Sequence, residues 1–202
     1  PDACKIDRYF MSTEPACQGC HSMMAPIGFG LAREGNNRVV RISIASGNFT
    51  GWIGNGVNGW QTNWSATATA SSAVRYFRNP SAIATDDTYL YIADRLNNRI
   101  VRWNIATGNF AGWLGHGKVA WEMNAAAPGS DPYAGVSYYP PDYYAEPQGL
   151  AVAKASSKGT KRNYLFMTSV YNGRVTRINL DCANNPASPS GECDPLYDPL
   201  TP

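Results

Sequence analysis

The amino-acid sequence predicts an all-β protein made of repeated antiparallel units, and three observations support this class. One block of residues recurs along the chain, apolar and polar residues alternate within it, and Asn or Gly stands where each strand must turn. The composition agrees, because 202 residues include Gly 19, Pro 14 and Tyr 12, while only 16% are charged. A soluble domain usually carries about 25% charged residues. We therefore expect a turn-rich protein with a polar but mostly uncharged surface.

The repeat is visible without any gap. Residues 36–41 (NNRVVR) return 61 positions later as NNRIVR, and residues 44–54 (IASGNFTGWIG) return at the same spacing as IATGNFAGWLG. Trp60 likewise has a counterpart in Trp121, and residues 172–180 form a third, weaker copy. Such self-similarity predicts one supersecondary unit per copy.

The second copy is the clearest, and its elements follow in chain order. A strand of small residues comes first, then an apolar strand, a tight Asn-Asn turn that tolerates positive φ, an alternating strand, a Gly-containing hairpin turn and a short aromatic strand. The expected strands are residues 80–86, 89–94, 99–105 and 110–114, with turns at 97–98 and 107–109. The third copy begins in the same way at residues 147–152.

This pattern resembles NHL-type β-propeller repeats, whose blades run Pro-x-Gly-Ile-Ala, Leu-Tyr-Ile-Ala-Asp and Asn-Asn-Arg-Ile. The second copy matches most of the pattern, and the third keeps its ends. In the first copy, residues 28–32 (GFGLA) stand where residues 89–93 stand later. The resemblance implies four-stranded antiparallel blades with a surface for ligands or partners. It implies no enzymatic residue, so we expect a protein that is not an enzyme.

The repeats predict a partial propeller with long insertions. Closure needs at least about four blades, whereas the sequence contains about three, and their spacing exceeds the ordinary 40–45 residues, roughly, of one blade. The excess lies in residues 55–79 and 116–146. We expect neighbouring copies of the chain to cover the open sheets, as a homo-oligomer or filament. The alternative is that the chain is one part of a longer propeller.

A second motif precedes the repeats, and it predicts a haem site. Cys17, Cys20 and His21 form the Cys-x-x-Cys-His pattern of c-type haem attachment. At this spacing two thiols reach the two vinyl groups of one porphyrin, and the adjacent imidazole lies under the iron. Two alternatives stay open: a disulfide beside an incidental His, and a zinc site that also uses Cys4.

Residues 20–30 (CHSMMAPIGFG) resemble cytochrome c segments in which a Met, a Pro and a Gly-Phe follow the motif. The resemblance implies one covalent haem c, with the two cysteines as thioether anchors and His21 on the iron. It does not identify the sixth ligand. Because the chain has only two His, ligation by a second His within one chain must use His116, which lies in a Gly-His-Gly turn. Met23, Met24 or a neighbouring subunit are the rivals.

The remaining cysteines predict an oxidising compartment. Cys182 and Cys193 flank a short loop rich in Pro, Asn and Ser, and a disulfide closing this loop is expected. This pair indicates a periplasmic, cell-surface or secreted protein, and it leaves Cys4 without an assigned role. Because the chain begins at Pro1 and not at Met, we expect a processed or excised product.

Charge and hydropathy exclude several partners. Lys+Arg 17 against Asp+Glu 15 leaves a net charge of +2, too small for the basic surface of a nucleic-acid binder. No apolar run approaches the ~18 residues of a membrane span. We divide the chain into an N-terminal haem-attachment segment (1–27), the propeller-like repeats (28–180) and a Cys/Pro-rich tail (181–202). The predicted function is electron transfer to a redox partner protein. The alternative is a haem-free extracellular binding, adhesion or fibre-forming module with structural disulfides.

Overall fold

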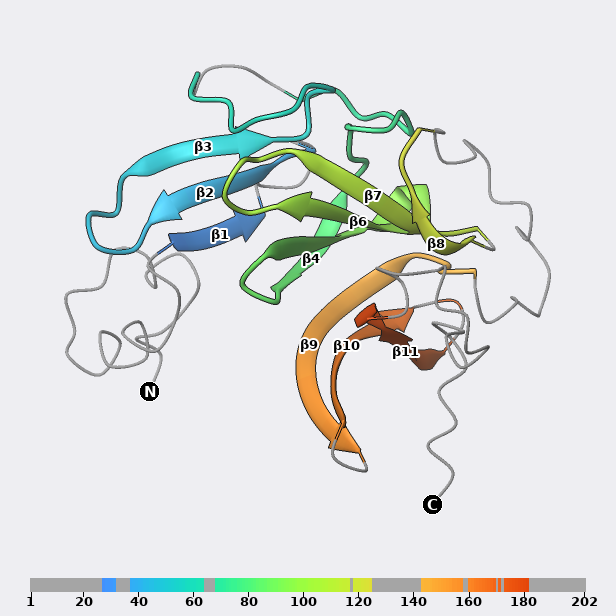
Figure 1. The fold of residues 1–202 in the computed structure, drawn as a ribbon. Coiled ribbons are helices and arrows are strands. Elements are labelled where there is room, and N and C mark those ends of the chain that lie inside the picture. Colours follow the sequence, from blue (N-terminus) through green and yellow to red (C-terminus); the bar gives the residue numbers. More distant parts are fainter. Residues whose placement is uncertain are drawn as a thin grey trace, which may run out of the picture.

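The chain folds into three antiparallel sheets that follow one another in sequence (Figure 1). The computed structural model describes residues 27–31, 37–63, 68–116, 118–124, 143–157, 160–169, 171 and 173–181. We call the sheets blade 1, blade 2 and blade 3. The predicted all-β, propeller-like partial fold is confirmed, and the described strands do not close a ring.

Each blade is a simple up-and-down succession of strands. Blade 1 contains β1 (Ile27–Leu31), β2 (Val39–Ser43) and β3 (Phe49–Ile53). Blade 2 contains β4 (Pro80–Thr85), β5 (Tyr89–Asp94), β6 (Arg99–Asn104), β7 (Phe110–Gly115) and β8 (Lys118–Glu122), with the 3-10 turn η1 (Arg95–Asn97) between β5 and β6. Blade 3 contains β9 (Pro147–Ser157), β10 (Thr160–Ser169) and β11 (Arg174–Asn179). The inner strand β4 lies beside both β1 and β9, which brings the three blades together.

The predicted strands of blade 2 agree with β4 to β7 to within one residue at their ends, whereas β8 lies in a segment predicted as an insertion. Residues 89–94 form β5 as expected, whereas β9 continues well beyond the predicted residue 152. In blade 1 the strand predicted at 28–32 begins one residue earlier, at Ile27. Leu31 pairs with Val39 as Ala93 pairs with Ile100, so the β1–β2 connection is one residue longer than the β5–β6 connection. An ungapped alignment cannot show this extra residue.

The repeated sequence produces a repeated irregularity between two strands. The register shifts at Arg41 between β2 and β3 and, 61 residues later, at Arg102 between β6 and β7. In each case the arginine reaches the carbonyl of the extra residue in the partner strand. Arg41 Nη2 donates to the Thr50 carbonyl at 3.0 Å, and Arg102 Nη2 donates to the Ala111 carbonyl at 2.7 Å. The side chain therefore satisfies an acceptor that the bulge leaves out of the ladder.

The same arginines stack on tryptophans, and this accounts for part of the long repeat. The Arg41 guanidinium lies 4.3 Å from the Trp60 ring, and that of Arg102 lies 4.3 Å from the Trp121 ring. Trp121 belongs to β8, the strand that follows the four strands of an ordinary blade. In blade 1 a single bridge between Trp52 and Gln61 replaces that strand. The additional residues thus extend the sheet of blade 2 by one more strand and that of blade 1 by one bridge.

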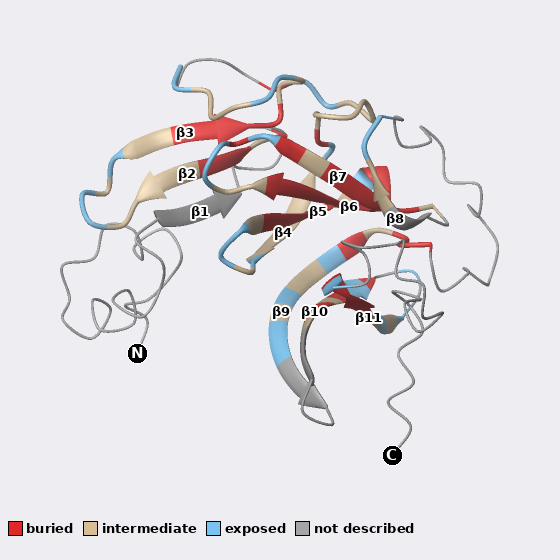
Figure 2. Ribbon diagram, in the orientation of Figure 1, coloured by how far each residue is buried: buried red, intermediate tan, exposed pale blue. Residues whose placement is uncertain are grey.

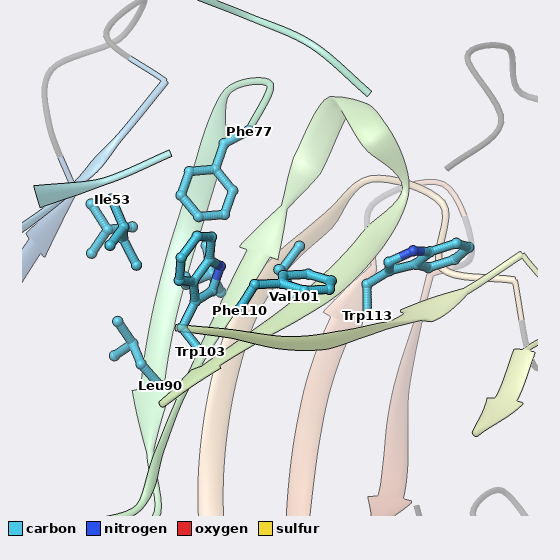
Figure 3. Packing of buried hydrophobic residues seen from close by; sticks show 9 residues of the cluster. Ile53, Phe77, Leu90, Val101, Trp103, Phe110 and Trp113 are labelled. Carbon is cyan, nitrogen blue, oxygen red and sulfur yellow. The ribbon is translucent and has the colours of Figure 1, made fainter. Parts of the chain in front are cut away.

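Two apolar cores join the blades. The core between blades 1 and 2 is dominated by aromatic rings (Figure 3) and consists of Val39, Ile53, Phe77, Leu90, Ile92, Val101, Trp103, Phe110 and Trp113. The core between blades 2 and 3 consists of Tyr91, Ile100, Leu114, Tyr144, Leu165, Met167, Ile178 and Leu180. Alternation places successive residues of β5 and β6 in different cores, so both faces of blade 2 are buried (Figure 2).

A repeated hydrogen bond fastens each blade to the connection that leads into the next. Asn37 Oδ1 accepts a hydrogen bond of 2.8 Å from the backbone N–H of Asn79, and Asn98 Oδ1 accepts one of 2.8 Å from that of Glu146. We call these two contacts the asparagine latches. Both acceptors have left-handed backbones, with φ of +44° and +50°, and both donors directly precede the proline that begins the next blade. Asn suits this position because it tolerates positive φ and carries the acceptor.

The centre of the chain contains a fully buried ion pair. Arg99 Nε donates to Asp94 Oδ2 at 2.7 Å, and both side chains are 0% exposed. The other Asp94 oxygen accepts from the Arg78 N–H at 2.7 Å. Burial raises the pKa of the Asp94 carboxyl, and the charge of Arg99 opposes this shift. The other two guanidinium nitrogens of Arg99 donate to the carbonyls of Ser72, Ala73 and Tyr76.

The buried pair makes a sharp prediction for Asp94→Asn. The substitution leaves the Arg99 charge buried without its counter-ion, so we expect the free energy of unfolding to fall by about 3 kcal/mol. Chemical denaturation measures this change. Asp87→Asn is the matched control, because Asp87 is exposed and lies 3.7 Å from Lys154. We expect the control to change stability by less than about 0.5 kcal/mol. Equal effects of the two substitutions would contradict the prediction.

The latch can be tested separately from its backbone conformation. Asn98→Gly keeps the left-handed turn and removes the acceptor, which leaves the Glu146 N–H without its partner. We expect a loss of about 1–2 kcal/mol in the free energy of unfolding. Asn98→Ala adds strain of about 1 kcal/mol at positive φ. Asp87→Gly is the control, because Asp87 is exposed and also has a positive φ, +77°. A result in which Asn98→Gly matches this control would show that the latch contributes nothing.

Candidate functional site

Of the candidate site residues, the structure describes His116 alone. The described ranges do not include Cys4, Cys17, Cys20, His21, Met23, Met24, Cys182 or Cys193. The predicted haem-attachment motif and the predicted disulfide therefore lie outside the described residues, and both stay predictions.

His116 follows β7 and is packed against the fold. Its backbone is left-handed, with φ of +53°, and its ring lies edge-on to Tyr143 at 4.9 Å and to Trp113 at 5.9 Å between centroids. Nε2 lies 3.0 Å from the carbonyl oxygen of Asn97, which places a ring N–H donor at this nitrogen. The expected turn is confirmed. A turn position of this kind suggests a side chain that projects freely, but two aromatic rings and a carbonyl hold the His116 ring.

This environment sets a condition for metal binding by His116. Iron ligation through Nε2 requires the hydrogen bond between this nitrogen and the Asn97 carbonyl to break. The role of His116 as a ligand stays a prediction. Within the described ranges, no three His, Cys, Asp or Glu side chains gather as a metal site. The Asp86-Asp87 pair forms a turn, since Asp86 Oδ1 accepts from the N–H groups of Thr88 and Tyr89.

Arginine recurs at the start of β2, β6 and β11, and the sequence favours a structural role over a phosphate site there. For Arg99 this is confirmed by its ion pair and carbonyl contacts. The Arg38 guanidinium lies 5.5 Å from the Trp52 ring. Arg174 is half-buried at the corresponding position of blade 3. These contacts place Arg99 in the scaffold of blade 2.

Sequence reasoning did not assign the second repeated arginine. Arg102 lies between two rings, 4.4 Å from Tyr89 and 4.3 Å from Trp121. Burial lowers the pKa of Arg102, and nearby Tyr89, Tyr91 and Asp86 oppose the shift. Burial, together with a 2.7 Å hydrogen bond to Asp86, raises the pKa of Tyr91. The available signal was that Arg41 and Trp60 recur together, at the same spacing, as Arg102 and Trp121. This indicates that the arginine and the tryptophan of each copy contact each other.

Comparisons with known proteins find little. No protein family matches the chain, and neither does any curated protein. A structural genomics protein of unknown function from Bacteroides thetaiotaomicron VPI-5482 is similar over 75% of this chain and 44% of its own, at 10% identity and a TM-score of 0.34. Hydrazine synthase from Kuenenia stuttgartiensis is similar over 77% of this chain and 43% of its own, at 14% identity and a TM-score of 0.33. The chain spans less than half the length of either structure.

Within the part of the chain that the structure describes, no helix has the length and hydropathy needed to span a membrane.

Proposed function

We propose that the protein is an exported c-type haem protein that transfers electrons to a redox partner protein. The observation that carries the proposal is the Cys-x-x-Cys-His motif at Cys17, Cys20 and His21 in a chain that has only two His. A haem supplies the one-electron chemistry when bound, and the chain supplies ligands, burial and dielectric.

The donor set fits one covalent haem. Two thiols and one imidazole within five consecutive residues match the two thioether bonds and one axial bond that haem c requires. The motif ends six residues before β1, so the chain tethers it closely to the first strand of blade 1. The blade then acts as the rigid support, since its residues in β2 and β3 pack into the core with blade 2.

Covalent attachment makes the first test direct. The intact mass of the chain should exceed the polypeptide mass by one haem, and acid-acetone should not extract the colour. Cys17→Ser with Cys20→Ser should abolish the added mass and the haem stain on a denaturing gel. Cys4→Ser is the matched control and should keep both. A chain of bare polypeptide mass with Cys17 and Cys20 joined in a disulfide would falsify the haem assignment.

The sixth ligand is a separate prediction. We propose His116, and we expect His116→Ala to convert a low-spin haem spectrum to high-spin and to raise the reduction potential. Tyr143→Phe serves as the control, because it keeps the ring against His116 and removes only the hydroxyl. If His116→Ala leaves the low-spin spectrum unchanged, the ligand is Met23, Met24 or a residue of another chain.

The second candidate function is a haem-free extracellular binding or adhesion module. It is favoured by two large exposed apolar side chains, Tyr171 at 63% between β10 and β11 and Val175 at 65% within β11. A visible spectrum separates the two functions. A sharp Soret band with c-type bands on reduction supports electron transfer, and a colourless protein supports the binding module.

A further inference from the structure

Equivalent residues form the contact between blades 1 and 2 and the contact between blades 2 and 3. Blade 3 carries the same residue positions on the face that lies away from blade 2. We call the sheet face that meets the following blade the trailing face, and the opposite one the leading face. In β6 and β11, Ile100 lies opposite Ala93 and Val175 lies opposite Thr168. Val175 thus occupies the position of Ile100 and, through the 61-residue repeat, of Val39.

Alternation along β11 confirms which face Val175 occupies. Ile178 packs into the core with blade 2, so Val175 and Arg177 point to the trailing face. Arg177 also keeps a contact of that face, because its guanidinium lies 5.1 Å from the Tyr164 ring, as that of Arg102 lies 4.4 Å from Tyr89. The trailing face of blade 3 is therefore built like that of blade 2.

Burial distinguishes the third copy from the first two. Val39 and Ile100 are each 0% exposed because a following blade covers them, whereas Val175 is 65% exposed. Ala93 is fully buried, and its counterpart Thr168 is exposed. Ala151 and Ala153, which share this face on β9, are exposed too, and Figure 2 shows exposed stretches along β9. An apolar position of the repeat is thus open only where the described chain places no further blade.

A complementary surface lies at the other end of the chain. On the leading face of blade 1, Ile42 and Phe49 are half-buried around the cluster that contains Trp52. Their counterparts in blade 2 are Trp103 and Phe110, which are 0% and 7% exposed against blade 1. This leading face carries apolar side chains at the positions that elsewhere receive a preceding blade. Val40 and Trp52 are already buried there with Ala68, and Ile42 and Phe49 remain half-buried.

We propose that a second copy of this chain docks head-to-tail, with the leading face of its blade 1 on the trailing face of blade 3. The two junctions inside the chain supply the pattern for this contact. The turn before β11 supports a separate chain. Gly173 has the left-handed φ of the latch residues, +55°, but it lacks the side-chain amide oxygen that holds a connecting segment in the other two blades. The contact therefore joins sheets without a latch.

Two copies arranged in this way contain six blades, within the range of about four to eight seen in closed propellers. Such an interface is heterologous, because different faces of the two chains meet, and two such contacts related by a two-fold axis close a ring. The proposal concerns the scaffold and does not depend on the haem.

Sedimentation velocity of the full chain at micromolar concentrations tests the contact. We expect the wild type to associate and Val175→Asp to weaken association at least about 10-fold, because a carboxylate would be buried unpaired. Val57→Asp is the matched control, since Val57 is also exposed, at 47%, but lies in the connection after β3. It should associate like the wild type.

Mixing two variants distinguishes this geometry from a symmetric contact of blade 3 with itself. Ile42→Asp should also dissociate the assembly. A mixture of Val175→Asp and Ile42→Asp chains retains one intact pair of faces, so heterodimers should form although neither variant associates alone. Circular dichroism checks that each variant is folded; if Ile42→Asp is not, the Val175 and Val57 pair decides. A monomeric wild type, unchanged association of Val175→Asp, or no rescue between folded variants overturns the proposal.

Discussion

The hydrogen bonds and the ion pair of the Arg99 guanidinium hold the middle of the molecule together. The guanidinium neutralises the carboxylate at the end of β5 and binds three carbonyls of the segment that connects blade 1 to blade 2. Asn97 reinforces it by donating to both Asp94 and the carbonyl of Ser71. Because blade 2 contributes a face to both apolar cores, the position of this turn determines how blades 1 and 3 can pack against it.

The sequence predicted the strands of blade 2 well because local chemistry dominates there. Strong β-formers alternate in residues 89–94, and Asn98 and Gly108 take the positive φ that the turn residues suggest. The one-residue shift of β1 was not predictable, since the β1–β2 connection contains one residue that has no counterpart in the β5–β6 connection. Nor could the sequence place His116 against Tyr143, because that contact joins positions separated by an insertion.

The candidate site is defined by neighbouring residues in the sequence, whereas the scaffold is defined by contacts between residues that are far apart in it. The haem motif is a local pattern, so five consecutive residues suffice to predict its chemistry. The role of a repeated arginine can be inferred only together with its contact partner. A guanidinium on a sheet can bind an anion, or it can donate to the carbonyl that a bulge leaves unpaired. Arg41 and Arg102 both cap carbonyls and stack on rings, which assigns them to the scaffold.

The segment that ends blade 1 also forms part of the surface of blade 2. The Gly59 N–H donates to the carbonyl of Gly108, and Trp60 Nε1 donates to that of Ile105, so residues of the first repeat close the hairpin of the second. The segments that stabilise one another therefore extend across the boundary between two sheets. In a linear array, coupling of this kind between neighbours makes adjacent repeats unfold together. Blade 2, which packs against both neighbours, then links the unfolding of the three described blades.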